Sequence, residues 1–130
     1  MMTIIYIIVG IVLLIFGLQS LMLLAARKSK GKKIAGLKGK LKGLEKNGSK
    51  GLVYFFSPSC HACKAQTPII KELQSSNKNV FDVDISKDME TAKIFGIKAT
   101  PTTMIVRNGV ISQVLLGVKQ KDALRKYLKK

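Results

Sequence analysis

The amino-terminal segment from Thr3 to Ala26 contains 24 residues and no charged side chain. At about 1.5 Å of rise per residue, a helix of this length spans the roughly 30 Å hydrocarbon core of a bilayer. A signal peptide requires a positively charged start and a shorter apolar run, and here no charged side chain precedes Arg27. The sequence therefore predicts a retained transmembrane anchor in residues 1–26, with a cleaved signal peptide as the alternative.

The charge that follows this segment predicts its orientation. Residues 1–50 contain ten Lys or Arg side chains and a single acidic one, in a chain whose net charge is +16. Five basic residues come directly after the apolar run: Arg27, Lys28, Lys30, Lys32 and Lys33. The positive-inside rule places that side, and the domain that follows, in the cytoplasm, with the extracytoplasmic side as the alternative.

The same lysines also indicate which partners to expect. Clustered basic residues next to a membrane span favour anionic lipid head groups. Nucleic acid is not an expected partner, because interleaved aromatic residues and a recognisable nucleic-acid module are missing from this stretch.

Residues 27–50 are predicted to form a basic linker with an amphipathic helix. Four apolar residues recur at intervals of three, four and three, which places them on one helix face: Ile34, Leu37, Leu41 and Leu44. Three glycines interrupt the pattern and weaken such a helix by up to about 1 kcal/mol each. The apolar face requires a surface, either the membrane or the domain's own sheet, and we favour the sheet.

Residues 51–130 show the pattern of a small α/β domain, with a start near residue 34 as the alternative. In chain order we expect a buried strand at Leu52–Phe56, a helix from Cys60 to about Leu73, a strand at Val80–Ile85, a helix at Asp88–Phe95, a hairpin of Thr102–Val106 and Val110–Leu116 around Asn108-Gly109, and a closing helix at Asp122–Lys129. The strand–helix–strand crossover predicts a parallel pair, and the Asn-Gly turn predicts an antiparallel hairpin. Helices should cover both faces of the sheet.

The two cysteines of the chain, Cys60 and Cys63, lie at the predicted start of a helix. Unpaired N–H groups and the positive end of the helix dipole stabilise a thiolate there and lower a thiol pKa from its usual value of about 8.5. Cys60 is therefore the expected nucleophile, and Cys63 the expected resolving thiol, of thiol–disulfide exchange. A protonated His61 would stabilise the thiolate, and an exposed histidine without a role is the plainer alternative.

Metal binding is the competing interpretation of two cysteines three residues apart. A structural zinc ion requires four ligands, and this chain offers two cysteines and one histidine, which lies inside the short loop between them. We therefore expect no metal and no cofactor other than a redox-active Cys60–Cys63 disulfide. A zinc site shared between two chains is the remaining alternative.

The domain resembles the thioredoxin-like family. The run LVYFFSPSCHACK at Leu52–Lys64 resembles the family's strand and active-site motif, Pro68 its helix-kinking proline, and FGIKATPTTMIVRNG at Phe95–Gly109 the segment around its cis-proline. The resemblance implies a cis bond between Thr100 and Pro101, and substrate binding at these residues through the backbone of Thr100. It also implies a thiol–disulfide oxidoreductase with protein substrates and an upstream redox partner, which the apolar segment of residues 1–26 would anchor in a membrane.

Three positions depart from the thioredoxin pattern. Ser59 replaces a tryptophan, His61-Ala62 replaces Gly-Pro, and Tyr54 replaces a buried aspartate. A complete first strand is also missing, so we expect a trimmed thioredoxin-like α/β fold: a central mixed sheet flanked by helices, with an N-terminal transmembrane helix. The alternative function is a non-catalytic, membrane-anchored assembly module that binds a peptide by strand addition in the groove around Pro101.

Overall fold

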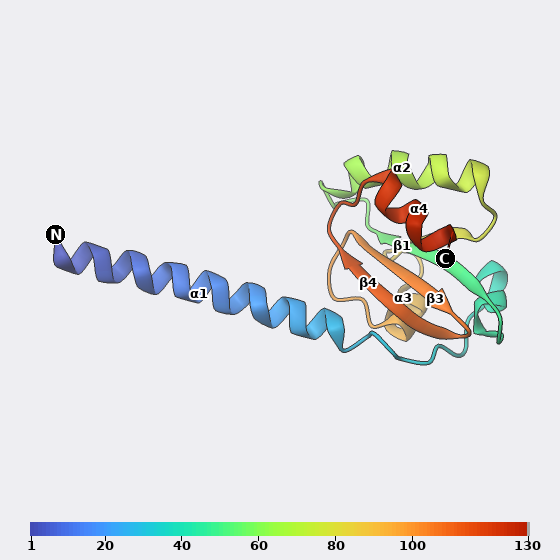
Figure 1. The fold of residues 1–130 in the computed structure, drawn as a ribbon, viewed down its shortest axis with the longest axis horizontal. Helices are drawn as coiled ribbons and strands as arrows, with labels where there is room; N and C mark the ends of the chain where they lie inside the picture. The colour runs from blue at the N-terminus through green and yellow to red at the C-terminus, as the bar shows by residue number, and fades with distance from the viewer. Residues whose placement is uncertain (130) are drawn as a thin grey trace.

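A computed structural model describes residues 1–129, the side chain of Ala26 excepted. Its first helix, α1 (Met2–Arg27), projects away from the rest of the chain in Figure 1. The large apolar side chains of α1 are exposed, and the 24 residues Met2–Ala25 reach a mean hydropathy of 2.7. This is the length and composition of a membrane span, and a signal sequence at the same place has the same properties.

Four strands form one mixed sheet in the order β2-β1-β3-β4. β1 (Lys50–Phe56) pairs in parallel with β2 (Val80–Asp84) and antiparallel with β3 (Thr102–Arg107), which pairs antiparallel with β4 (Val110–Leu116). Five consecutive residues of β1 are buried, because this strand lies inside the sheet and both of its faces are covered. The predicted parallel pair and the predicted antiparallel hairpin are both confirmed.

Helices cover both faces of the sheet, as the sequence predicts (Figure 1). On one face lie α2 (Cys63–Ser76) and α4 (Lys121–Lys129), and on the other lie α3 (Met89–Phe95) and the 3-10 helix η1 (Gly39–Glu45). Successive residues of β1 point to opposite faces, so Leu52 and Tyr54 pack toward α2 and α4. Val53 and Phe55 pack toward α3 and η1. Each face therefore has its own apolar core.

Turn and cap residues determine where several elements begin and end. Asn108 and Gly109 have φ values of 54° and 72°, which the two-residue turn between β3 and β4 requires. α3 begins after Asp88, whose carboxylate accepts a hydrogen bond from Thr91 N, and it ends at Gly96 in the left-handed region. The predicted hairpin and the predicted end of α3 are confirmed.

The amphipathic helix predicted within residues 34–46 is wrong. Only η1 is helical there, and Gly36 and Gly39 have φ values of 86° and 60°, which interrupt an α-helix. The four apolar side chains of the pattern are nevertheless buried in the core on the α3 face of the sheet: Ile34, Leu37, Leu41 and Leu44. The segment packs on the domain's own sheet, as predicted.

The chain between α1 and η1 runs along the outer edge of β4. Lys33 forms an isolated antiparallel bridge with Val110, and Gly31 N donates a hydrogen bond to Ile111 O at 2.7 Å. Within residues 1–129 no regular strand precedes β1, so the fold is trimmed as predicted. These bonds attach the segment that follows α1 to the sheet.

Candidate active site

The two cysteines lie in the connection between β1 and α2. Ser57 O accepts a hydrogen bond from Cys60 N at 3.1 Å, which closes a turn after the end of β1. α2 begins at Cys63, three residues later than predicted, because residues 61–62 form a second turn. The Cα atoms of Cys60 and Cys63 are 5.3 Å apart, and a disulfide joins the two side chains. The dithiol therefore opens the helix that crosses over from β1 to β2.

The two sulfur atoms have different surroundings. Cys63 N donates a hydrogen bond to Cys60 Sγ at 3.2 Å, so an N–H group of the first turn of α2 points at that sulfur. The positive end of the helix dipole adds to its effect. Cys60 is half-buried, whereas only 3% of Cys63 is exposed. Negative charge is therefore stabilised on the sulfur that a second molecule can reach.

A cleft of about 350 Å³ opens beside the disulfide. Its walls come from the loop after β1 and from the first turns of α2: Phe56, Ser57, Pro58, Cys60, Cys63, Lys64, Thr67 and Pro68. Pro68 lies inside α2, at the place where the resemblance implies a helix-kinking proline. His61 is exposed and does not belong to these walls. The cleft gives another sulfur atom a route to Cys60.

The loop before β3 reaches the same edge of the sheet as the cysteines. Phe55 of β1 pairs with Thr102 of β3, so the loop that follows β1 and the loop that precedes β3 leave the sheet side by side. The peptide bond between Thr100 and Pro101 is cis, as the resemblance implies. Thr100 is half-buried and Pro101 is buried. The structure thus brings these two residues to the edge that carries the dithiol.

A buried glutamine that was not predicted connects α2 to this loop. Gln66 is fully buried, its Nε2 donates to Lys119 O at 3.2 Å, and its Oε1 accepts from Lys119 N at 2.6 Å. Gly117 N in turn donates to Pro101 O at 3.0 Å, so α2 and the two loops are held together. The sequence did contain a signal, since Gln66 shares the three- and four-residue spacing of the buried face of α2, with Cys63, Ile70 and Leu73.

Tyr54 lies next to the dithiol, where the resemblance leads one to expect an aspartate. Its side chain is fully buried, and its hydroxyl donates to Cys63 O at 3.3 Å and lies 3.1 Å from Thr67 Oγ1. Burial raises the pKa of Tyr54, the hydrogen bond with Thr67 opposes this rise, and the negative charge of Asp82 adds to it. At neutral pH, Tyr54 is therefore an uncharged hydrogen-bond donor to the first turn of α2.

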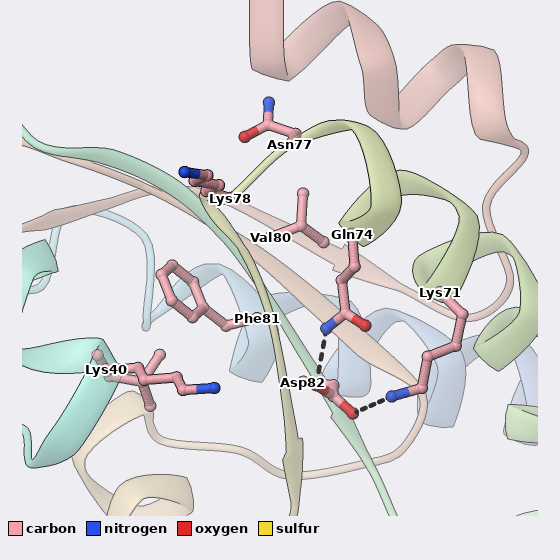
Figure 2. A pocket seen from close by; sticks show the side chains of 9 residues that line it. Lys40, Lys71, Gln74, Asn77, Lys78, Val80, Phe81 and Asp82 are labelled. Carbon is pink, nitrogen blue, oxygen red and sulfur yellow. Dashed lines mark hydrogen bonds and ion pairs between the residues drawn. The ribbon is translucent and has the colours of Figure 1, made fainter.

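A second cleft, of about 560 Å³, lies along β2 and shares no lining residue with the cleft beside the disulfide (Figure 2). Asp82 accepts hydrogen bonds there from Lys71 Nζ at 3.1 Å and from Gln74 Nε2 at 2.7 Å. Partial burial raises the pKa of Asp82, but these bonds and the charge of Lys71 outweigh it and hold the pKa below its usual range. This cluster therefore connects α2 to β2. Among residues 1–129, no group of His, Cys, Asp and Glu side chains could hold a metal ion.

A dithiol that opens a crossover helix, beside a cis-proline at the same sheet edge, defines a thiol–disulfide oxidoreductase of the thioredoxin fold. Comparison with known proteins gives the family as well. The family model described as thioredoxin matches residues 41–130, and the chain belongs to the thioredoxin family.

Individual thioredoxins agree with this assignment. The thioredoxin of Bacillus subtilis (strain 168) is 29% identical over 87 residues, which cover 63% of this chain and 84% of that protein. The thioredoxin of Rickettsia conorii is 36% identical over 83 residues, covering 61% and 78% of the two chains. The structure of reduced Schistosoma mansoni thioredoxin pre-protein superposes with a TM-score of 0.55 at 30% identity, covering 64% of this chain and 80% of that one.

The family and the CxxC disulfide together give the activity. The chain is a thiol–disulfide oxidoreductase, which sets aside the non-catalytic alternative. Thioredoxins act on disulfides of protein substrates and are themselves reduced by thioredoxin reductase.

Proposed function

We propose that Cys60 is the nucleophile of this thioredoxin and Cys63 its resolving thiol. The hydrogen bond from Cys63 N to Cys60 Sγ carries the assignment, because it stabilises a thiolate on the more accessible sulfur. In the reduced protein, the Cys60 thiolate attacks one sulfur of a substrate disulfide, forms a mixed disulfide and expels the other substrate sulfur as a thiolate. Cys63 then gives up its proton to solvent and attacks Cys60 Sγ, which releases the second substrate thiol. Two electrons have passed to the substrate, and the Cys60–Cys63 disulfide remains.

Thr100 and Pro101 are proposed to hold the substrate during this exchange. An extended substrate segment would pair with the backbone of Thr100, as a strand added to a sheet edge does. Two observations support this role: the loop leaves the sheet beside the strand that leads to the cysteines, and Gln66 and Gly117 help to fix its position.

His61 is proposed to tune the thiolate. It directly follows Cys60 and its side chain is exposed. A protonated imidazole there, together with the charge of Lys64, would favour the thiolate over the thiol.

We further propose that α1 is a retained membrane anchor and that the thioredoxin-like domain begins near residue 34 rather than at 51. The burial of Ile34 and Leu37 in the same core as β1 supports this start. Exposed basic residues at the end of α1 and directly after it, such as Arg27 and Lys30, would meet anionic head groups. By the positive-inside rule they would also place the domain in the cytoplasm, where a thioredoxin reductase would supply its electrons.

Reduction of insulin by the full chain in detergent solution tests the two cysteine roles. With dithiothreitol as the electron donor, Cys60→Ser should abolish turnover. With protein reduced beforehand and no added donor, Cys63→Ser should accumulate a mixed disulfide through Cys60, which non-reducing electrophoresis and mass spectrometry detect. Ser59→Ala is the matched control, since Ser59 is exposed and does not line the cleft, and it should retain activity. Equal turnover by the wild type and Cys60→Ser would contradict the assignment.

The orientation has its own test. Intact cells are treated with a membrane-impermeant thiol reagent under reducing conditions, and labelling of Cys60 is compared before and after lysis. We expect labelling only after lysis. Efficient labelling of intact cells would move the domain to the other side of the membrane.

A further inference from the structure

The last turns of α1 and the cis-proline loop border the same cleft. A cleft of about 340 Å³ is lined by residues of both, most of them apolar: Gln19, Met22, Leu23, Ala99, Thr100, Pro101, Leu116 and Gly117. Met22 and Leu23 are each 55% exposed, so half of each side chain remains open to a further partner. The proposed substrate-binding residues therefore share a cleft with the proposed membrane anchor.

Very little free chain separates the anchor from the domain. α1 ends at Arg27, and Ser29 is already buried, with its Oγ donating to Gly96 O at 3.5 Å. Gly31 N donates a hydrogen bond to Ile111 O of β4, and Ile34 N donates one to Gly109 O in the turn before β4. A domain attached in this way cannot swing freely away from the end of α1.

Helix length indicates the depth of this cleft relative to a bilayer. The 24 residues Met2–Ala25 give a helix of about 36 Å, about 6 Å longer than the hydrocarbon core. With this excess at its carboxyl end, next to the basic residues, the last turn of the span with Met22 and Leu23 would lie at the interface with the head groups. In Figure 1, the loop that joins β1 to α2 lies on the side of the domain from which α1 projects, above the end of the helix. The dithiol edge thus faces the membrane surface.

Basic side chains border the same region. Arg27, Lys30 and Lys119 line a neighbouring hollow of about 550 Å³ between α1 and β4. Lys64 and Lys98 are exposed and belong to the first turn of α2 and to the loop before the cis-proline. Positive charge around an apolar cleft matches the chemistry of a bilayer surface, where anionic head groups adjoin acyl chains.

We propose that the substrates of this dithiol are themselves membrane proteins, with the reactive cysteine in an extended segment directly adjoining a transmembrane helix. This inference rests on the proposed function. The segment would pair with Thr100 and place apolar side chains against Met22 and Leu23, while its own helix lies beside α1 in the bilayer. A soluble substrate has to enter between the domain and the bilayer to reach the same wall of the cleft.

The test uses the full reduced chain in vesicles of phosphatidylcholine and phosphatidylglycerol. Two synthetic probes share one transmembrane helix and carry a cysteine in a mixed disulfide with a chromophoric thiol. In the near probe this cysteine directly follows the helix, and in the far probe it ends a long flexible tail. Cys60 attacks the probe sulfur and releases the chromophore, after which Cys63 releases the probe thiol and leaves the protein oxidised. We expect the near probe to react at least about tenfold faster than the far probe, through its higher effective concentration at the cleft.

Two further variants test the contribution of the α1 wall of the cleft independently of the dithiol. A flexible Gly/Ser segment inserted between Arg27 and Lys28 should abolish the preference for the near probe. Met22→Ala with Leu23→Ala should slow the near probe, and Leu13→Ala with Leu14→Ala, a matched pair farther along α1, should leave its rate unchanged.

Each outcome decides one question. Equal rates for the two wild-type probes, or a preference that survives the inserted segment, would overturn the inference on membrane substrates. If the same preparation still reduces insulin in detergent solution, the proposed function stands. A wild type that fails to reduce insulin would instead overturn the proposed function.

Discussion

At the scale of single residues, the expected roles of the two cysteines could be inferred from the sequence, whereas the contact made by Tyr54 could not. The roles expected of Cys60 and Cys63 followed from their spacing and from the strand before them, both of which are local. The contact of the Tyr54 hydroxyl with Cys63 O depends on the packing of α2 over the sheet, which spacing alone does not specify. As a result, the sequence showed Tyr54 in place of an aspartate, but it did not show the hydrogen bond from the uncharged Tyr54 hydroxyl to Cys63 O.

Tyr54→Phe should lower the free energy of unfolding by about 1 kcal/mol at neutral pH, because a buried hydrogen bond is lost. The pKa of Tyr54 is raised in the folded state, so its stabilising contribution is complete below the unfolded value of about 10 and is lost as the pH rises through the folded value. The stability difference between the wild type and Tyr54→Phe should therefore shrink above about pH 10.

Denaturant titrations of the two proteins at several pH values, on chains beginning at Lys28, measure this difference. Titrating lysines affect both chains equally and cancel in the comparison. A difference that stays constant up to about pH 11 would show that Tyr54 titrates alike in both states.

At the scale of elements, sequence patterns predicted the parts that local forces build. The apolar run of β1, the Asn108-Gly109 turn and the end of α3 at Gly96 each depend on residues close together in the chain. The segment from Ile34 to Leu44 was different, because its side chains are held by the sheet and its glycines adopt positive φ. Its apolar spacing correctly indicated burial and wrongly indicated an α-helix.

Gln66 connects two elements, and its removal should affect both stability and substrate binding. Gln66→Leu leaves the backbone N–H and C=O of Lys119 without partners, so the free energy of unfolding should fall by about 2–3 kcal/mol. The loosened loop should also raise the KM for insulin more than it lowers kcat. Gln74→Leu is the matched control on the same helix, since it removes a bond to Asp82 at the surface and should cost about 0.5 kcal/mol or less. Equal losses in the two variants would contradict a special role for Gln66.

At the scale of the whole molecule, the segment behind α1 packs together with the domain. It contributes four buried apolar side chains to the core on the α3 face, and its backbone adds to the outer edge of β4. The matched family region begins at residue 41, inside this segment. In place of a regular first strand, the trimmed fold therefore has an irregular segment along β4 that buries Ile34 and Leu37.

A chain beginning at Lys28 should unfold cooperatively, and a chain beginning at Lys46 should not. The shorter chain lacks the four buried side chains, each of which contributes about 1.5–3 kcal/mol to stability. Their sum is comparable to the whole free energy of unfolding of a domain, which is roughly 5–15 kcal/mol. Thermal unfolding followed by circular dichroism distinguishes the two. A cooperative transition in the shorter chain would place the start of the domain after η1.

The packing of Ile34 against Val106 and Ile111 has a consequence for the order of events during synthesis. A ribosome releases α1 and Ile34 early, and it releases the β3–β4 hairpin only near the end of translation. The core on that face cannot close in the interval, whereas α1 is already available for insertion into a bilayer. Insertion of α1 as the proposed membrane anchor would thus precede folding of the domain.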